Sequence, residues 1–305
     1  MRRQLNLFKN NMSISNQIKI FYINLNDRND RLKFIKNQLK KNQLIGKKIK
    51  GIKPNHLDKK MINKYKNYLT PSGIAGCLVH KKIWELIIKK NIKCALILED
   101  DALISQNLKI FLQNVNKILK TEEIDIININ THEMLTKIGK LKHYFKEIKT
   151  GLYNLISIEY GTAGYLITNK CARKLVKDKN FFKLQIDMYL FGKTSNSSKI
   201  QNIYQAYPAL SIPLASIETN KYKLYSSYFK DSNEFNKVAM SSSDYNNYKN
   251  ENIFIKSLNI IGNYIKQKLH LKSFKIGRIY FYTKHYSNIM FSNKGYKVIY
   301  NKYKI

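Results

Sequence analysis

Acidic residues are scarce in this chain of 305 residues, in which 20 Asp and Glu stand against 55 Lys and Arg. The resulting formal charge of +35 favours an anionic partner: a nucleic acid, an acidic membrane surface or a phosphorylated substrate. The chain is also rich in Lys, Asn, Ile and Tyr together, a mixture that an AT-biased genome produces without any selection for binding. The charge alone leaves both explanations open.

Cysteines and long apolar runs are also few. Cys77, Cys94 and Cys171 have neither paired nor metal-type spacing, which predicts buried thiols in a reducing compartment. No stretch approaches 18 apolar residues, so no membrane-spanning helix is predicted, and residues 1–10 lack the apolar centre of a signal peptide. We therefore expect a cytoplasmic protein, with a peripheral position on the inner face of the inner membrane as an open alternative.

Apolar residues nevertheless make up 44% of the chain, enough for a substantial core. The pattern predicts an N-terminal tail, a main domain, a polar linker or lid, and a basic, mostly helical extension, at residues 1–16, 17–215, 216–252 and 253–305. Apolar residues at helical spacing over 254–269 indicate a basic amphipathic helix in that extension. Such a helix suits an anionic membrane surface or packing against the main domain.

The main domain opens with a strand over residues 18–25 and a helix whose apolar positions are Leu32, Ile35 and Leu39, which is a βα unit of an α/β sheet. Asp27 or Asp30 is expected to cap this helix. Arg28 and Arg31 lie in the connecting loop, three residues apart, and either face a phosphate together or pair with those aspartates at the surface.

A second strand over 48–52 and a basic helix precede a longer helix from Pro71 to about Lys90, with Thr70 as its cap. His80 and Trp84 are four residues apart and share a face of this helix. Gly73 and Gly76 are unusual inside a helix, which predicts either close packing or the approach of a ligand at these positions.

The next strand runs through Cys94–Leu98, an apolar segment typical of a strand buried on both faces, into Glu99, Asp100 and Asp101. Three adjacent carboxylates repel one another unless a positive group lies between them. A hard divalent cation such as Mn²⁺ or Mg²⁺ would neutralise them and hold a diphosphate as well, although acidic triplets also occur as solvated turns.

Further along, a helix is expected over 108–119, a strand over 124–129, a loop or insertion over 131–150, and the last strand of the domain over 200–208. The segment from Tyr160 to Thr168 contains two glycines, which let the backbone approach another group closely, and Asn169 can cap the helix that follows. Asp187 stands in an otherwise apolar segment, where a carboxylate must be paired, bound to metal or used in chemistry.

Taken together, these segments resemble glycosyltransferase family 25, the lipooligosaccharide-biosynthesis glycosyltransferases, over roughly residues 17–210. Val79 departs from the family, which usually has a serine before the histidine, so this chain lacks that hydroxyl. Four blocks match in order: Ile23-Asn24-Leu25 with Arg28 and Arg31; Leu69-Thr70-Pro71 through Gly76 to His80, with Trp84; Ala95 through Asp101; and Gly161 through Tyr165, with Ala172 and Asp187.

The resemblance implies a GT-A-like, Rossmann-related α/β fold with a single sheet flanked by helices. It also implies transfer of a hexose, often galactose, from a nucleotide sugar such as UDP-galactose to a glycolipid or oligosaccharide, with Mn²⁺ or Mg²⁺ and inversion at the anomeric carbon. Physically, a strand-end acidic cluster and an arginine loop suit a diphosphate and a cation. The resemblance implies that Asp101 binds the metal together with Glu99 or Asp100, and that Asp187 acts as the catalytic base, with Asp101 also catalytic. It further implies that the nucleotide pocket is lined by Asn24, Leu25, Arg28 and Arg31. His80 and Trp84 would support the donor site, and Gly164 and Tyr165 would border the sugar.

Two other classes of function stay open. A nucleic-acid-binding protein would use the net charge and the tyrosines, but no nucleic-acid-binding module is recognisable, so no nucleic-acid partner is expected. A catalytically silent, membrane-peripheral scaffold is disfavoured by the three acids and the arginine loop. A phosphotransferase would need a glycine-rich, lysine-bearing phosphate loop, which the chain lacks.

Overall fold

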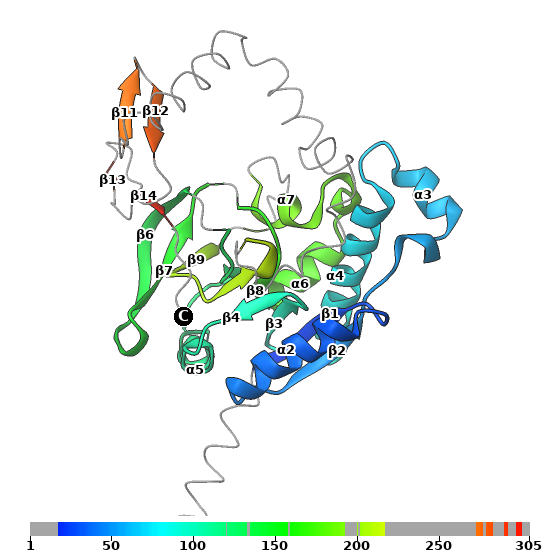
Figure 1. Cartoon of the computed structure of the whole chain (residues 1–305), viewed down its shortest axis with the longest axis horizontal. Helices are drawn as coiled ribbons and strands as arrows, with labels where there is room; N and C mark the ends of the chain where they lie inside the picture. The colour runs from blue at the N-terminus through cyan, green and yellow to red at the C-terminus, as the bar shows by residue number, and fades with distance from the viewer. Residues whose placement is uncertain are drawn as a thin grey trace, which may run out of the picture.

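The computed structural model describes residues 18–119, 121–132, 135–157, 159–192, 200 and 202–216, together with four short strands between residues 273 and 300 (Figure 1). Within these residues, ten strands form one mixed sheet in the order β13-β14-β6-β7-β9-β5-β8-β3-β1-β2. Their bounds are β1 Ile18–Asn24, β2 Gly46–Lys50, β3 Cys94–Glu99, β5 Ile126–Asn128, β6 Leu135–Phe145, β7 Thr150–Leu155, β8 Gly164–Thr168, β9 Ile203–Tyr207, β13 Met290–Phe291 and β14 Lys297–Tyr300.

The strands that end at Asn24 and at the acidic triplet run in one direction. β1 is parallel to both β2 and β3, β5 is parallel to β9, and β8 runs antiparallel between β3 and β5. The carboxyl ends of β1, β2, β3, β5 and β9 therefore meet at one edge of the sheet, which we call the carboxyl edge. Two further pairs lie outside this sheet: β4 (Ala102–Ile104) with β10 (Ser211–Pro213), and β11 (Ser273–Ile276) with β12 (Ile279–Tyr282).

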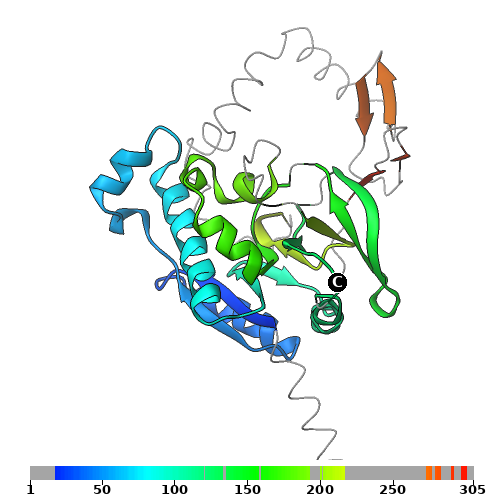
Figure 2. The same cartoon turned by 180° about the vertical axis from the view of Figure 1, so that it is seen from behind.

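Helices cover both faces of the sheet because side chains alternate along each strand. On β3, Leu96 and Leu98 pack in one apolar cluster with α2 and α5, whereas Ala95 and Ile97 pack in another with α4 and α6 (Figures 1 and 2). The described helices are α2 Asn29–Lys41, α3 Lys59–Tyr65, α4 Pro71–Lys89, α5 Leu108–Ile118, α6 Asn169–Val176 and α7 Ile186–Phe191, with 3-10 turns η1 Pro54–His56, η2 Lys146–Ile148, η3 Phe181–Lys183 and η4 Leu214–Ser216. The predicted α/β sheet flanked by helices is thus confirmed.

Several local predictions are also confirmed. Thr70 caps α4, where its hydroxyl accepts a hydrogen bond from the Gly73 N–H at 3.2 Å, and Pro71 is the first helical residue. All three cysteines are buried free thiols. No helix among the described residues is long and apolar enough to cross a membrane.

Two predicted helix caps are wrong. Arg28 occupies the N-cap position of α2, where no side chain caps the helix; Asp27 instead pairs with Lys53 and Asp30 with Arg28. The cap of α6 is Thr168, one residue before the predicted Asn169, and its hydroxyl accepts from the Cys171 N–H.

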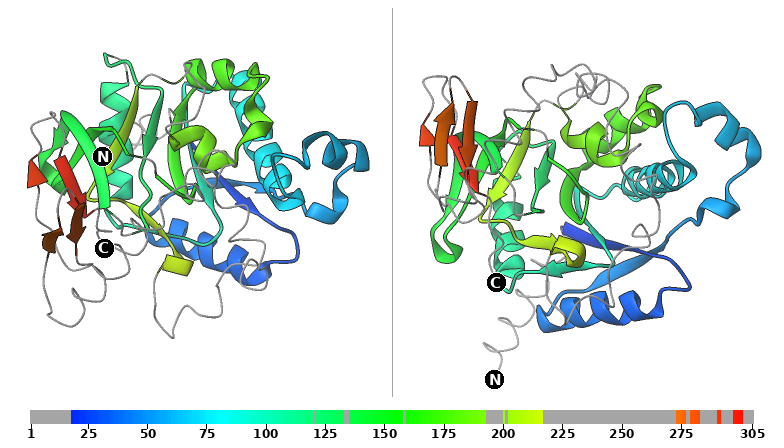
Figure 3. Two further views of the ribbon diagram at one scale, coloured as in Figure 1. Left: turned by 90° about the horizontal axis from the view of Figure 1, so that it is seen from above. Right: turned by 45° about the horizontal axis from the view of Figure 1, so that its top comes forward.

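Of the two alternatives predicted for residues 131–150, a loop or an insertion over the sheet edge, the loop is wrong, because β6 and β7 form a hairpin that extends the sheet (Figure 3). The strand predicted as the last of the domain, β9, is followed by β10. In the C-terminal extension the described residues are strands, and β13 and β14 join the main sheet beside β6, so the mostly helical character is not found there. The helix predicted over 254–269 and the tail over 1–16 lie outside the described residues.

Candidate active site

The acidic triplet lies at the carboxyl edge, as the sequence predicts. Cys94–Leu98 is buried on both faces of the sheet, and β3 ends at Glu99. Because β1 pairs in parallel with β3, with Ile23 opposite Glu99, the next residue Asn24 lies beside the acids. The Asn24 side-chain amide donates hydrogen bonds to the Asp100 carboxylate at 2.7 Å and to the Arg28 carbonyl oxygen at 3.0 Å. Asn24 thus ties the acids to the arginine-bearing loop.

The positive group between the acids is Arg31. Its Nη1 lies 3.0 Å from Asp100 Oδ1 and its Nη2 lies 3.1 Å from Asp101 Oδ2, so one guanidinium bridges both carboxylates. The three side chains are only 8–12% exposed, which strengthens the attraction relative to a surface pair. Arg28, in contrast, pairs with Asp30, whose side chain is 42% exposed. The surface-pair interpretation is therefore right for Arg28 and wrong for Arg31.

Glu99 lies on the side of β3 that faces α4 and accepts a hydrogen bond from the Thr162 hydroxyl at 2.5 Å. Burial, followed by repulsion from Asp101, raises the pKa of Glu99 to about 7. Burial also raises the pKa of Asp101, against the opposing effect of Arg31. The acidic end is thus a partly neutralised cluster at neutral pH. Sequence reasoning gave Thr162 no role, although it stands inside the glycine–tyrosine block.

Two buried oxygens of this cluster have no hydrogen-bond partner in the structure: Asp101 Oδ1 and Asn24 Oδ1. Buried acceptors in this state are uncommon in folded proteins and indicate a place for an ion, a water or a ligand group. Among the described residues, however, no group of three or more His, Cys, Asp or Glu side chains is arranged to hold a metal ion. Any cation here would need ligands from outside the acidic triplet.

His80, Trp84 and Tyr165 form one buried hydrogen-bonded group beneath the site. Trp84 Nε1 donates to Tyr165 Oη at 3.1 Å, and Tyr165 Oη lies 2.8 Å from His80 Nδ1. Since the indole can only donate, the tyrosine hydroxyl accepts from it. Burial lowers the pKa of His80 to about 3, so the imidazole is neutral, and its tautomer decides which partner donates in the bond between His80 and Tyr165. His80 and Trp84 are thus held in the core through Tyr165, and the donor-supporting role predicted for them stays a prediction.

The predicted sugar border of Gly164 and Tyr165 is wrong as direct contact. Tyr165 is fully buried, and Gly164 is buried against Ser211, whose hydroxyl would overlap a Cβ at this position. Both residues pack inside the sheet, where they leave no surface for a sugar. Leu25 is half-buried at the end of β1, and its carbonyl oxygen accepts from the Arg28 N–H at 3.1 Å.

Asp187 is half-buried in the first turn of α7, so the apolar sequence around it exaggerates its burial. Its Oδ2 accepts from the Gly161 N–H at 3.0 Å and its Oδ1 from the Met188 N–H at 2.8 Å. Gly161 has a φ of +75°, and a side chain at this position would overlap His132. Because Thr162 follows Gly161, a single loop connects Asp187 to Glu99.

His132 is a residue that sequence reasoning missed. It follows β5 at the carboxyl edge, and its Nδ1 lies 2.7 Å from the Ser216 hydroxyl while its Nε2 is buried next to Gly161. Burial lowers its pKa, and the negative charge of Asp187 opposes that shift. Its sequence context, a polar stretch read as a loop, carried no signal for this position.

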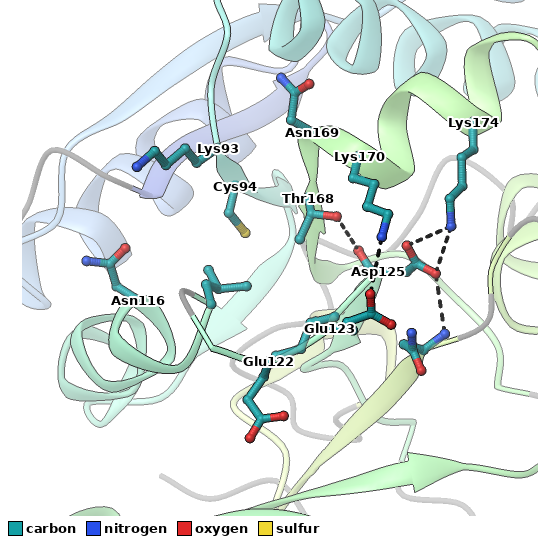
Figure 4. A pocket seen from close by; sticks show the side chains of 13 residues that line it. Lys93, Cys94, Asn116, Glu122, Glu123, Asp125, Thr168, Asn169, Lys170 and Lys174 are labelled. Carbon is teal, nitrogen blue, oxygen red and sulfur yellow. Dashed lines mark hydrogen bonds and ion pairs between the residues drawn. The ribbon is translucent and has the colours of Figure 1, made fainter.

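A cavity of about 380 Å³ lies at the opposite edge of the sheet, around the start of β3 (Figure 4). Carboxylates and lysines both line it, and Lys174 pairs there with the buried Asp125. None of the predicted site residues lines this cavity. The chemistry of the predicted site therefore gathers at the carboxyl edge and not here.

Comparisons with known proteins point the same way. Residues 17–190 match the sequence profile of glycosyltransferase family 25 (LPS biosynthesis protein). The lipooligosaccharide biosynthesis protein lex-1 of Haemophilus influenzae is 28% identical over 175 residues, which are 54% of this chain and 57% of that protein. Procollagen galactosyltransferase 1-A of Xenopus laevis is 28% identical over 188 residues, 56% of this chain and 30% of that protein. The matched segment thus spans little more than half of the first relative and less than a third of the second.

Among solved structures, a glycosyltransferase involved in the glycosylation of the major capsid of PBCV-1 matches 68% of this chain and 97% of its own, at 8% identity and a TM-score of 0.38. So distant a likeness decides nothing about the fold. The match over residues 17–190 includes the acidic triplet Glu99–Asp101, the arginines Arg28 and Arg31, and Asp187.

Proposed function

The chain belongs to glycosyltransferase family 25, and from this premise we propose that it transfers a hexose from a nucleotide sugar to a glycan acceptor. UDP-galactose is the donor we expect, because two of its relatives carry the name procollagen galactosyltransferase. A lipooligosaccharide or related glycolipid is the acceptor we expect, by analogy with lex-1. A GT-A-like arrangement of the sheet and inversion at the anomeric carbon belong to the same proposal.

The observation that carries this proposal is the convergence of the acids, Arg31 and Asn24 at the carboxyl edge. Open α/β sheets bind their ligands outside the carboxyl ends of their strands. A sugar nucleotide brings a diphosphate, which needs both positive charge and hydrogen-bond donors. Arg28, at the N-cap of α2 beside the acids and with its side chain 18% exposed, is the arginine that can turn to a phosphate without leaving buried acids unpaired.

A divalent cation, Mn²⁺ or Mg²⁺, fits the chemistry of this cluster. Such ions are commonly held by one or two carboxylates, with the substrate's phosphates and waters as the other ligands, so three clustered acids are not required. Asp101, with Glu99 or Asp100, would hold the ion, and the unpartnered Asp101 Oδ1 and Asn24 Oδ1 are the oxygens that lack another role. The ion would neutralise charge on the departing diphosphate.

Asp187 is the first candidate for the base. Each of its oxygens accepts one backbone hydrogen bond and keeps a free lone pair, so the carboxylate is held in place and can accept a proton. In the proposed reaction Asp187 takes the proton of an acceptor hydroxyl, whose oxygen then bonds to the anomeric carbon. The bond between that carbon and the phosphate oxygen breaks, and the nucleoside diphosphate leaves.

The test is a donor screen with Mn²⁺ present, scored by hydrolysis or by transfer to a defined oligosaccharide. We expect turnover of UDP-galactose, a loss on the order of 100-fold in Asp101→Asn and in Asp187→Asn, and full activity in Asp30→Asn, which removes an exposed acid from the same neighbourhood. An enzyme that neither binds nor turns over any nucleotide sugar would refute the proposal. Salt-dependent retention of oligonucleotides in its place would favour a nucleic-acid-binding protein.

A further inference from the structure

Gly76 lies inside α4, where a glycine destabilises a helix by about 1 kcal/mol relative to alanine. A Cβ built at Gly76 would meet no atom within 4 Å outside the local helix backbone. Close packing, one of the two explanations that the sequence allowed, is therefore wrong for this residue. At Gly73, one turn earlier, a Cβ would make ordinary contacts of 3.4–3.6 Å with Leu69 and Thr70. The two glycines thus differ in one respect: only Gly76 borders open space.

The direction of α4 places Gly76 at the carboxyl edge. The helix ends at Lys89, shortly before the amino end of β3 at Cys94, and its 19 residues extend about 28 Å back across the sheet. His80, one turn after Gly76 and on the same face, contacts Tyr165 of β8, which pairs with Ile97 of β3. Gly76 therefore lies further toward the carboxyl edge than the Ile97–Tyr165 pair.

Two parts of the proposed active site lie on the α4 side of the sheet. Glu99 follows Ala95 and Ile97 at alternate positions of β3, and both of those side chains pack with α4. Next to Gly76 on the helix, the thiol of Cys77 donates to the Leu184 carbonyl oxygen at 3.6 Å, in the segment that leads into α7 and Asp187. The turn that carries Gly76 therefore lies on the face of the sheet from which Glu99 extends and beside the segment that precedes Asp187. At the same edge, Asp101 Oδ1 is a buried acceptor without a partner, which independently indicates a ligand there.

We propose that Gly76 determines donor specificity, because its missing side chain leaves the space in which the transferred hexose lies. This inference rests on the proposed glycosyltransferase function and adds to it the residue that admits the sugar. The nucleotide and diphosphate lie on the α2 side of the acids, near Arg28 and Asn24, so a side chain at position 76 obstructs the hexose and not the nucleotide.

The test compares Gly76→Ala and Gly76→Val with the matched control Gly73→Ala in the full chain. Titration with UDP and with UDP-galactose, both in the presence of Mn²⁺, separates the nucleotide from the sugar. We expect unchanged affinity for UDP in all variants, and affinity for UDP-galactose about tenfold or more lower in Gly76→Ala and lower still in Gly76→Val. Gly73→Ala is expected to bind both ligands as the wild type does. Thermal unfolding of Gly76→Ala should show a melting temperature equal to or above that of the wild type, since alanine favours the helix.

Each outcome decides a different question. Wild-type affinity of Gly76→Val for UDP-galactose would overturn the role of Gly76 and leave the transferase function standing. Equal losses for UDP and UDP-galactose would also overturn it, because the residue would then act on the nucleotide or on the whole site. A lowered melting temperature in Gly76→Ala would show that the space is needed for packing. If the wild type binds no nucleotide sugar, the proposed function fails first and the role of Gly76 fails with it.

Discussion

Replacing Arg31 by methionine should destabilise the protein strongly, because one guanidinium serves two buried carboxylates. Met has a similar length and no charge, so the change removes both ion pairs with Asp100 and Asp101 while the aliphatic packing is largely kept. Breaking a buried ion pair by removing one partner destabilises proteins by about 3–5 kcal/mol, because the remaining charge stays buried. We expect an effect of about 3–5 kcal/mol on the free energy of unfolding at pH 8.

The size of this effect should depend on pH in a defined direction. Burial and the charge of Asp100 raise the pKa of Asp101, whereas Arg31 lowers it. Without Arg31 the pKa of Asp101 therefore rises further, so the folded variant binds more protons than the unfolded chain. The deficit is then largest at pH 8 and shrinks as the pH falls toward 5, because protonation of Asp101 removes buried charge. Urea unfolding monitored by the emission of Trp84, which is the one tryptophan of the chain and fully buried, measures both values.

Two further variants make the test sharp. Arg28→Met removes a pair with the exposed Asp30 from the same helix start, and should lower stability by no more than about 1 kcal/mol. Arg31→Met combined with Asp100→Asn and Asp101→Asn should recover most of the loss at pH 8, because no unpaired charge remains. A chelator in the buffer keeps adventitious cations from replacing the guanidinium. If Arg31→Met costs no more than Arg28→Met, or costs the same at pH 5 and pH 8, the buried bridge does not hold the acids as described.

Two other predictions concern buried polar groups. Burial raises the pKa of Glu159 from 4.5 to about 7, so between these pH values the folded state binds a proton that the unfolded chain has lost. About 3 kcal/mol of stability is therefore lost as the pH rises from 4.5 to 7. Urea unfolding of Glu159→Gln should lack this decline, and parallel pH profiles for the variant and the wild type would contradict the prediction. Tyr165→Phe leaves Trp84 Nε1 and His80 Nδ1 without their partner and should lower stability by about 2–4 kcal/mol with a shift of Trp84 emission. Tyr144→Phe, at a hydroxyl on a half-exposed residue, is the control and should change neither quantity.

The elements nearest the site could be predicted because their local patterns are strong. The unbroken apolar run over Cys94–Leu98 predicts a buried strand, and Thr70 and Pro71 predict the observed start of α4. Both signals depend on neighbours in the sequence. The position of the acidic triplet at the carboxyl edge follows from the same reasoning, since a parallel sheet brings the carboxyl ends of its strands together.

The hairpin of β6 and β7 could not be predicted in the same way. Residues 131–150 are basic and have no clear alternation, and β6 is irregular, with register shifts around Leu141. Its pairing partners β7 and β14 decide that it is a strand. The burial of Asp187 was misjudged for a related reason. Apolar neighbours along the chain do not show that α7 turns its first residues toward the Gly161 loop, where the carboxylate meets two backbone N–H groups.

The charge of the acidic triplet shows most clearly how far the sequence can predict the site. Three adjacent carboxylates after a buried strand predict repulsion and hence a positive partner, and that prediction is correct in kind. Part of the repulsion is removed by the raised pKa of Glu99, which at about 7 leaves this group partly protonated at neutral pH. Most of the rest is removed by Arg31, which reaches Asp100 from 69 residues earlier in the chain. The sequence places Arg31 three residues after Arg28, in a loop that suits phosphate binding, and nothing local separates their roles. The parallel pairing of β1 with β3 separates their roles, because it places the start of α2 beside the acids. Arg31 then points toward the acids, while Arg28 pairs with Asp30.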